Sequence, residues 1–128
     1  MASEMIIRPR FCDTDALGHI SNVALPAWFE QGREAVFEVF NPGQNLDKWN
    51  MILKYMTIDF IGQMYFGEPV DLRTYISKVG SSSFTVAQEA WQKGECCAKG
   101  EAVMVYFDFE KQQKRSIPDD IREKLLAI

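Results

Sequence analysis

The sequence predicts an α+β fold in which one five-stranded antiparallel sheet wraps around one long central helix. Three observations support this prediction. A single helical pattern of apolar residues lies early in the chain, the apolar spacing changes to every second residue after it, and the later segments are joined mostly by tight turns. Short turns require antiparallel neighbours, and a helix with so much apolar surface needs a sheet to cover it.

The first strand is expected over residues 5–11. Pro9 lies inside this segment and cannot donate to a ladder, so part of the strand is expected at an edge or a bulge. The segment that follows is rich in aspartate and reads as a loop, which separates this strand from the helix.

The helix is expected to run from Asn22 or Val23 to Phe40. Its apolar residues recur at helical spacing: Leu25, Trp28, Phe29, Val36, Val39 and Phe40. Ser21 or Asn22 can cap its start, and the Asn-Pro-Gly segment at 41–43 gives a clear stop. We therefore expect one continuous helix of about five turns.

Four strands follow at period-two spacing, and the first of them, over residues 52–61, is expected to be long and mostly buried. The alternate positions that mark the other three strands, in chain order, are Val70, Leu72, Thr74 and Ile76, then Phe84, Val86 and Ala90, then Val103, Val105, Phe107 and Phe109. Turns are expected at 80–83 and 93–95, and a short helix should open at residues 117–120 and end at Leu126.

Length and composition bound the classes of function. A chain of 128 residues is expected to form one domain with one modest core. The net charge of −4 and the pI near 5.0 argue against a broad nucleic-acid-binding face. The chain has no run of 18 apolar residues and no basic, apolar leader at its start, so we expect a cytoplasmic protein without a membrane segment. Its three cysteines, Cys12, Cys96 and Cys97, are expected to be reduced.

The loop before the helix holds the chemistry that the sequence offers. Asp13 and Asp15 lie on a segment that contains Gly18 and ends where the helix begins. The exposed N–H groups of a helix start can polarise a carbonyl oxygen, and a nearby carboxylate can attack that carbonyl or activate a water. This arrangement suits acyl transfer.

The same stretch resembles a known family. The hotdog-fold acyl-CoA thioesterases of the 4-hydroxybenzoyl-CoA thioesterase family read Arg-aromatic-x-Asp-x-Asp-x-x-Gly-His-Val-x-Asn, followed by a helix with aromatic-Phe-Glu-x-x-Arg. The matching residues here are Arg10, Phe11, Asp13, Asp15, Gly18, His19, Ile20 and Asn22, then Trp28, Phe29, Glu30 and Arg33. The resemblance runs nearly end to end, because residues 80–84 and 117–122 also resemble the family's turn and closing segment.

The resemblance implies hydrolysis of an acyl-CoA thioester, with Asp15 as the nucleophile or general base. Backbone N–H groups near Asn22 and Val23 would then polarise the carbonyl. The expected substrate-binding residues are Gly18, His19, Asn22, Val23 and Leu25. Contacts to coenzyme A are expected from Lys78, Gly80, Ser81, Ser82 and Ser83, with Lys99 as a further candidate cation. No cofactor is implied, because coenzyme A is part of the substrate.

Other roles compete for these side chains. Asp13 more often ties such a loop together through backbone N–H groups, and His19 more often braces it than reacts. Glu30 and Glu34 lie on the helix, where some hotdog enzymes place their carboxylate. A calcium loop is excluded because Leu17 and Ala24 occupy positions that need oxygen ligands, and no metal site is expected.

Three other functions remain open: a hotdog module that binds acyl-CoA without turnover, a thioesterase for acyl-carrier protein, and, least favoured, an enoyl-thioester hydratase. Where the family usually has a Tyr on the first helical turn, this chain has Leu25 followed by Pro26, and Ser21 stands where Asn is common. A wall of Leu and Pro favours aliphatic or compact acyl groups. One open sheet around one helix leaves unpaired edges, so we expect a homodimer with a continuous ten-stranded sheet, or a dimer of dimers. The ligand groove would then lie at the subunit boundary.

Overall fold

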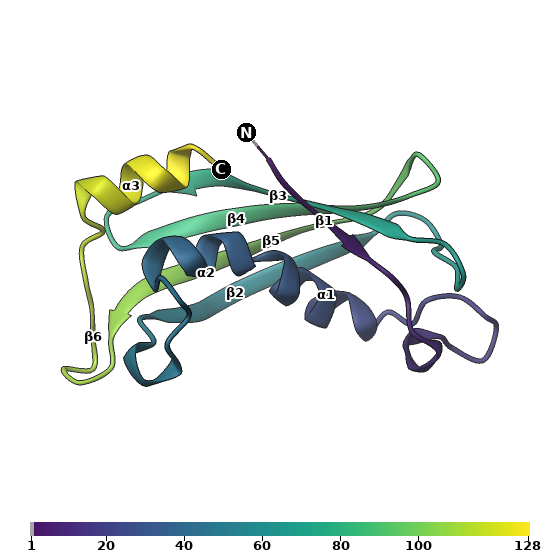
Figure 1. Cartoon of the computed structure of the whole chain (residues 1–128), viewed down its shortest axis with the longest axis horizontal. Helices are drawn as coiled ribbons and strands as arrows, with labels where there is room; N and C mark the ends of the chain where they lie inside the picture. The colour runs from purple at the N-terminus through teal and green to yellow at the C-terminus, as the bar shows by residue number, and fades with distance from the viewer. Residues whose placement is uncertain (1) are drawn as a thin grey trace.

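Figure 1 shows the computed structural model, which describes residues 2–128, as one curved sheet with two short helices lying end to end across one of its faces. The elements are β1 (Ser3–Ile7), η1 (Phe11–Asp13), α1 (Ala24–Gly32), α2 (Glu34–Phe40), η2 (Leu46–Lys48), β2 (Met51–Phe60), β3 (Val70–Val79), β4 (Ser83–Gln92), β5 (Glu95–Asp108), β6 (Gln113–Lys114) and α3 (Asp119–Leu126). The five long strands pair in the order β1-β3-β4-β5-β2, and all pairs are antiparallel. The α+β hotdog fold expected from the sequence is confirmed.

The face of the sheet under the helices carries the core. Leu72, Ala90 and Ala98 lie in one row across β3, β4 and β5, and all three are fully buried. Burying these side chains against Phe29 and its neighbours removes apolar surface from water at about 25 cal/mol per Å². This packing holds α1 against the sheet and so fixes where the helix begins.

The first strand is shorter than expected. The strand β1 ends at Ile7, two residues before Pro9, and residues 11–13 form the 3-10 turn η1 rather than strand. The reason is local: the backbone N–H of Arg10 donates to the Asp13 carboxylate at 2.8 Å, and Pro9 has no N–H to offer a ladder. The chain therefore turns at Pro9 instead of extending to Phe11.

The prediction of one continuous helix is wrong at Arg33, where α1 ends and α2 begins. Side chains from the sheet capture the helix carbonyls at this point. Gln88 Nε2 donates to the Phe29 carbonyl at 2.8 Å, and the Thr74 hydroxyl donates to the Gly32 carbonyl at 3.1 Å. The Arg33 N–H instead donates to Glu30, one residue closer along the chain than in an α-helix. The axis therefore breaks where the sheet competes for the helical hydrogen bonds.

Gly32 makes this close approach possible. A Cβ placed there would lie 2.5 Å from Leu72 Cδ2 and 2.8 Å from Gln88 Nε2. The helix start also differs slightly from the prediction, because Ala24 is its first residue and neither Ser21 nor Asn22 caps it through a side chain. The Ser21 hydroxyl accepts only the Val23 N–H, at 3.3 Å.

The strand β2 is an edge strand, so the prediction that it is mostly buried is wrong within this chain. Only Met51 is buried, whereas Leu53 and Tyr55 are 41% and 60% exposed. Period-two patterning predicted the strand itself correctly. The turns at 80–83 and 93–95 and the closing helix, predicted from glycine and proline signals, are also confirmed. An exposed apolar edge is a common site for association with another strand.

Candidate active site

Three short backbone segments pair at the end of the sheet where α1 begins. The Asp15 N–H donates to the His19 carbonyl at 2.8 Å, and the Ile20 N–H donates to the Met64 carbonyl at 2.8 Å. Gly18 adopts φ +82° in the turn between Asp15 and His19, a conformation that glycine takes without steric cost. These pairings attach the aspartate loop to the segment that follows β2.

The Asp15 carboxylate is oriented by this loop. Its Oδ1 accepts the Leu17 N–H at 2.7 Å and the His19 N–H at 3.1 Å. Its Oδ2 lies 3.9 Å from His19 Nδ1, and the side chain is 39% exposed. One oxygen is therefore committed to the loop, while the other remains available at the surface.

A cavity of about 610 Å³ lies beside this carboxylate. Its lining comes from the aspartate loop, the start of α1 and the segment after β2: Asp15, Ile20, Ser21, Asn22, Leu25, Phe60, Ile61, Gly62, Gln63 and Met64. Asp15 is the sole charged side chain in this lining. The structure thus brings Asp15, Asn22 and Leu25, all predicted from the sequence, into one cavity.

Other predicted residues lie near the cavity without lining it. Gly18 forms the turn of the loop, and Val23 is 78% exposed at the helix start. The His19 ring packs edge-on against Tyr65, with centroids 5.2 Å apart. The expectation that His19 braces the loop agrees with this contact and with its backbone bond to Asp15.

Asp13 is buried and paired with Arg10. Both carboxylate oxygens accept hydrogen bonds from Arg10, and Arg10 Nη2 lies 3.0 Å from Asp13 Oδ1. Burial alone would raise the pKa of Asp13, but the hydrogen bonds and the charge of Arg10 outweigh it, so this pKa lies below its ordinary value. The same pairing raises the pKa of Arg10. Asp13 therefore closes the loop, as expected from the sequence.

This pairing predicts an acid-sensitive contribution to stability. Because the folded pKa of Asp13 lies below its unfolded value of about 3.9, the contribution is present above that pH and is lost as the pH falls through the folded pKa. We expect Asp13→Asn to lower the free energy of unfolding by about 1–3 kcal/mol at neutral pH. Urea unfolding from neutral to acid pH checks this, with Asp47→Asn, at an exposed residue outside the sheet, as the control. An unchanged acid dependence in Asp13→Asn would contradict the assignment.

Lys78 and the turn 80–83, predicted to contact coenzyme A, lie at the other end of the sheet, whereas Lys99 pairs with Asp59 near the end that carries the aspartate loop. The turn 80–83 follows β3, whereas the aspartate loop lies where β3 starts, so the ten residues of β3 separate them by about 33 Å. Figure 1 shows this turn beside α3. Its carbonyls accept hydrogen bonds from the C-terminal part of the chain, including the Ile117 N–H and Arg122 Nη2. Within one chain, the structure does not bring Lys78 or this turn to Asp15.

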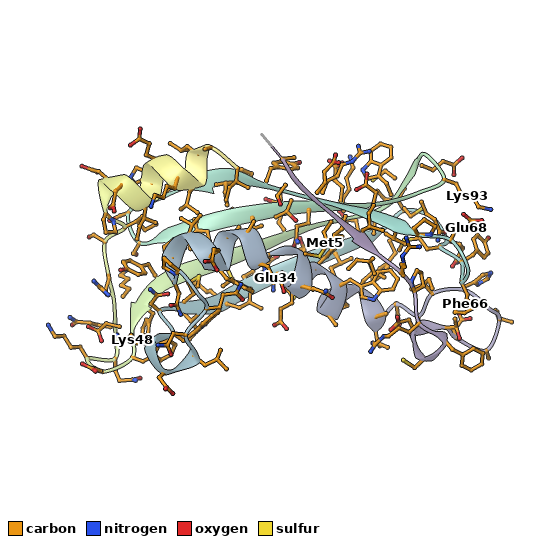
Figure 2. The ribbon with its side chains drawn as sticks, in the orientation of Figure 1. Met5, Glu34, Lys48, Phe66, Glu68 and Lys93 are labelled. Carbon is orange, nitrogen blue, oxygen red and sulfur yellow. The ribbon has the colours of Figure 1, made fainter. Side chains whose placement is uncertain are left out.

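The alternative carboxylates lie elsewhere as well. Glu30 and Glu34 line a separate groove on the outer face of the helices, together with Phe37, Leu46 and Trp49. Figure 2 shows Glu34 on this face, well apart from Phe66, which marks the end of the molecule with the aspartate loop. Neither glutamate shares the cavity with the start of α1.

The cavity wall formed by residues 60–64 was not predicted from the sequence. This segment is fixed by the Ile61 and Gly62 N–H groups, which both donate to the Cys97 carbonyl at 2.9 and 3.0 Å. Cys97 itself is buried, and burial raises the pKa of its thiol. No local pattern signals that this segment faces Asp15, because the contact that joins the two is the hydrogen bond from the Ile20 N–H to the Met64 carbonyl, 44 positions further along the chain.

Neither a membrane-spanning helix nor a metal cluster occurs among residues 2–128. No helix in this range is long and apolar enough to cross a bilayer. In the same range, no three His, Cys, Asp or Glu side chains gather closely enough to share a metal ion.

A curved antiparallel sheet around a helix, with a carboxylate beside the helix start, defines a hotdog protein of the thioesterase type. The chain belongs to the thioesterase-like superfamily, whose family model matches residues 9–125. It is 30% identical to the uncharacterized protein YsmA of Bacillus subtilis (strain 168) over 118 residues, which are 91% of this chain and 80% of YsmA.

Two solved structures are similar over nearly their whole length. A predicted thioesterase from Bacillus stearothermophilus has a TM-score of 0.97 and 40% identity, covering 99% of this chain and 96% of that one. A thioesterase from Thermus thermophilus, in complex with coenzyme A and Zn, has a TM-score of 0.86 and 26% identity, covering 97% of this chain and 91% of that one. These likenesses confirm the resemblance to the thioesterases.

Proposed function

We propose that this protein hydrolyses an acyl-CoA thioester to a free carboxylic acid and coenzyme A, with Asp15 as the nucleophile or general base. The observation that carries the proposal is the cavity in which the Asp15 carboxylate and the start of α1 meet. Membership in the thioesterase-like superfamily and the coenzyme A bound to the similar Thermus thioesterase support the substrate class.

The two oxygens of Asp15 have different roles in this proposal. Oδ1 is held by two backbone N–H groups, which fix the carboxylate plane, and Oδ2 is the oxygen that reacts. A positioned base contributes about 10²–10⁴-fold to a rate. Preorganisation matters because a carboxylate that must first find its orientation loses much of that advantage.

The carbonyl oxygen would be held at the helix start. The Val23 N–H already donates to the Ser21 hydroxyl, and the Ala24 N–H donates to the Ser21 carbonyl. The N–H of Asn22 makes no hydrogen bond to another residue of the described chain, and Asn22 lines the cavity. We therefore assign the oxyanion contact to Asn22 rather than to Val23. One such donor is worth about 10²–10³-fold.

A second copy of the chain would complete the site. The free edge of β2 exposes Ile52, Leu53, Tyr55 and Phe60, and antiparallel pairing of two such edges gives a continuous ten-stranded sheet. In such a dimer the two copies of β2 run in opposite directions. The end of the partner's sheet that carries its turn 80–83 would therefore lie on the same side as the aspartate loop of the first copy. The turn 80–83, remote from Asp15 within one chain, then approaches the Asp15 of the other copy. Coenzyme A would be bound across the subunit boundary.

The acyl group is expected to be aliphatic. Five apolar side chains line the cavity: Ile20, Leu25, Phe60, Ile61 and Met64. Each buried methylene contributes about 0.8 kcal/mol, close to a fourfold effect on kcat/KM. Free-thiol release from a panel of aliphatic and benzoyl-type CoA thioesters tests both function and preference, and the same acyl groups on acyl-carrier protein test the carrier. A clear advantage for the aromatic thioesters would contradict the expected preference.

A further inference from the structure

The site contains a glutamine that no part of the thioesterase motif includes. Gln63 lies in the segment after β2 and lines the cavity together with Asp15. We propose that the Gln63 carboxamide holds the water that attacks the thioester. This inference rests on the proposed function with Asp15 as the base, and it names the residue that positions the second reactant.

Backbone pairing places Gln63 on the same side as Asp15. His19 pairs with Tyr65 in an antiparallel bridge, and Asp15 pairs with His19 through its N–H. Paired residues in such a ladder share a face, and the short contacts of the His19 ring with Asp15 and Tyr65 agree with this. Side chains alternate along an extended segment, so Gln63, two residues before Tyr65, shares that face.

The Gln63 carboxamide is free, unlike that of its neighbour Gln92. Gln92 uses its carboxamide structurally, accepting the Tyr65 N–H at 2.8 Å and donating to the Tyr65 and Glu68 carbonyls. Gln63 is exposed, and its carboxamide makes no hydrogen bond to any other residue between 2 and 128. The loop is therefore already held by Gln92, which leaves Gln63 available to a ligand or water.

A water at Asp15 needs more than one partner. Ordered waters in proteins typically make about three hydrogen bonds. Asp15 Oδ2 supplies one acceptor, because Oδ1 is occupied by the loop, and the Ser21 hydroxyl, which also lines the cavity, already accepts the Val23 N–H. Gln63 Oε1 supplies a second acceptor, which leaves a lone pair of the water directed at the carbonyl carbon. A water with both protons held in this way is oriented for attack.

Hydrolysis then needs one proton to move onto Asp15 and off it again. The water oxygen forms a bond to the carbonyl carbon while one water proton passes to Asp15 Oδ2, and the carbonyl electrons move to the oxygen facing Asn22. The C–S bond then breaks, the carboxylic acid forms, and the leaving thiolate takes the proton from Asp15. Gln63 accepts a hydrogen bond throughout and neither gains nor loses a proton.

Gln63→Leu tests this role, because leucine keeps much of the volume and removes the carboxamide. We expect kcat to fall roughly 10–100-fold, with KM within about twofold because the acyl and coenzyme A contacts remain. Gln31→Leu, at an exposed glutamine on α1, is the matched control and should retain wild-type kinetics. Hydroxylamine, added as a competing acyl acceptor, gives the readout that separates positioning from structure.

If Gln63 holds water, Gln63→Leu should raise the ratio of hydroxamate to free acid, because the substitution slows attack by water more than it slows attack by hydroxylamine. An unchanged ratio, or an unchanged kcat in an active wild type, would overturn the role of Gln63 and leave the thioesterase proposal standing. A wild type that releases no thiol from any acyl-CoA or acyl-carrier-protein substrate would overturn both.

Discussion

Replacing Asp15 by Asn is expected to lower kcat for thioester hydrolysis by about 10²–10⁴-fold while leaving substrate binding nearly intact. Asparagine keeps an oxygen that can accept the Leu17 and His19 N–H groups, so the loop geometry survives. What is lost is the basic or nucleophilic oxygen at the position of Oδ2. Free-thiol release measures the rate, and calorimetric titration with a slowly hydrolysed acyl-CoA measures the binding.

Glu30→Gln is the matched control for this substitution, because it removes a carboxylate that lies on the helix but lines a different groove. We expect it to retain wild-type turnover. If Glu30→Gln abolished turnover and Asp15→Asn did not, the reactive carboxylate would lie on the helix instead. If Asp15→Asn lost binding together with turnover, its role would be structural.

Replacing Tyr55 by Glu in the edge strand β2 is expected to dissociate the proposed dimer and to reduce turnover with it. Tyr55 is 60% exposed in the single chain and lies near the middle of β2, where two copies would approach each other. The substitution removes aromatic contact area and places like charges together in both copies. We expect the dimer dissociation constant to rise at least about 100-fold, which corresponds to about 2.8 kcal/mol.

Light scattering and turnover at matched concentrations measure these effects. The wild type should have twice the 14.7 kDa mass of one chain. Ile6→Glu is the control, because Ile6 is similarly exposed, at 57%, on the opposite edge strand β1. A monomeric wild type that is fully active, or equal effects of the two substitutions, would contradict a site shared between copies through β2.

The sequence predicted the elements that depend on local patterns. The period of the apolar residues indicated the sheet and the helical region, and proline and glycine indicated the turns. The pairing of Asp15 with the helix start was also predictable, because both lie within one short segment. The prediction that Asp13 holds the loop together agrees with its hydrogen bonds and ion pair with Arg10.

The features that the sequence did not predict arise from distant contacts. The helix breaks because Gln88 reaches Phe29 and Thr74 reaches Gly32, across 59 and 42 positions of sequence. These hydrogen bonds can be predicted only once it is known that β3 and β4 pack under the helix. Arg33, at the break, is buried beside Gln88, and burial lowers its pKa.

The exposure of β2 has a similar origin. An apolar strand with period two looks the same whether its cover comes from its own chain or from another one. The strand order places β2 at the edge, so the apolar side chains of Leu53 and Tyr55 have no cover within the chain. Local patterns also do not predict the cavity wall at 60–64, because its position depends on hydrogen bonds to Ile20 and Cys97, which are distant in sequence.

The structure of Asp15→Asn with a bound acyl-CoA tests the central geometry most directly. We predict that the thioester carbonyl oxygen lies within hydrogen-bond distance of the Asn22 N–H, at about 2.7–3.1 Å, with the side chain at position 15 facing the carbonyl carbon. A thioester bound away from the cavity between the aspartate loop and residues 60–64, with residue 15 in bulk solvent, would contradict the account.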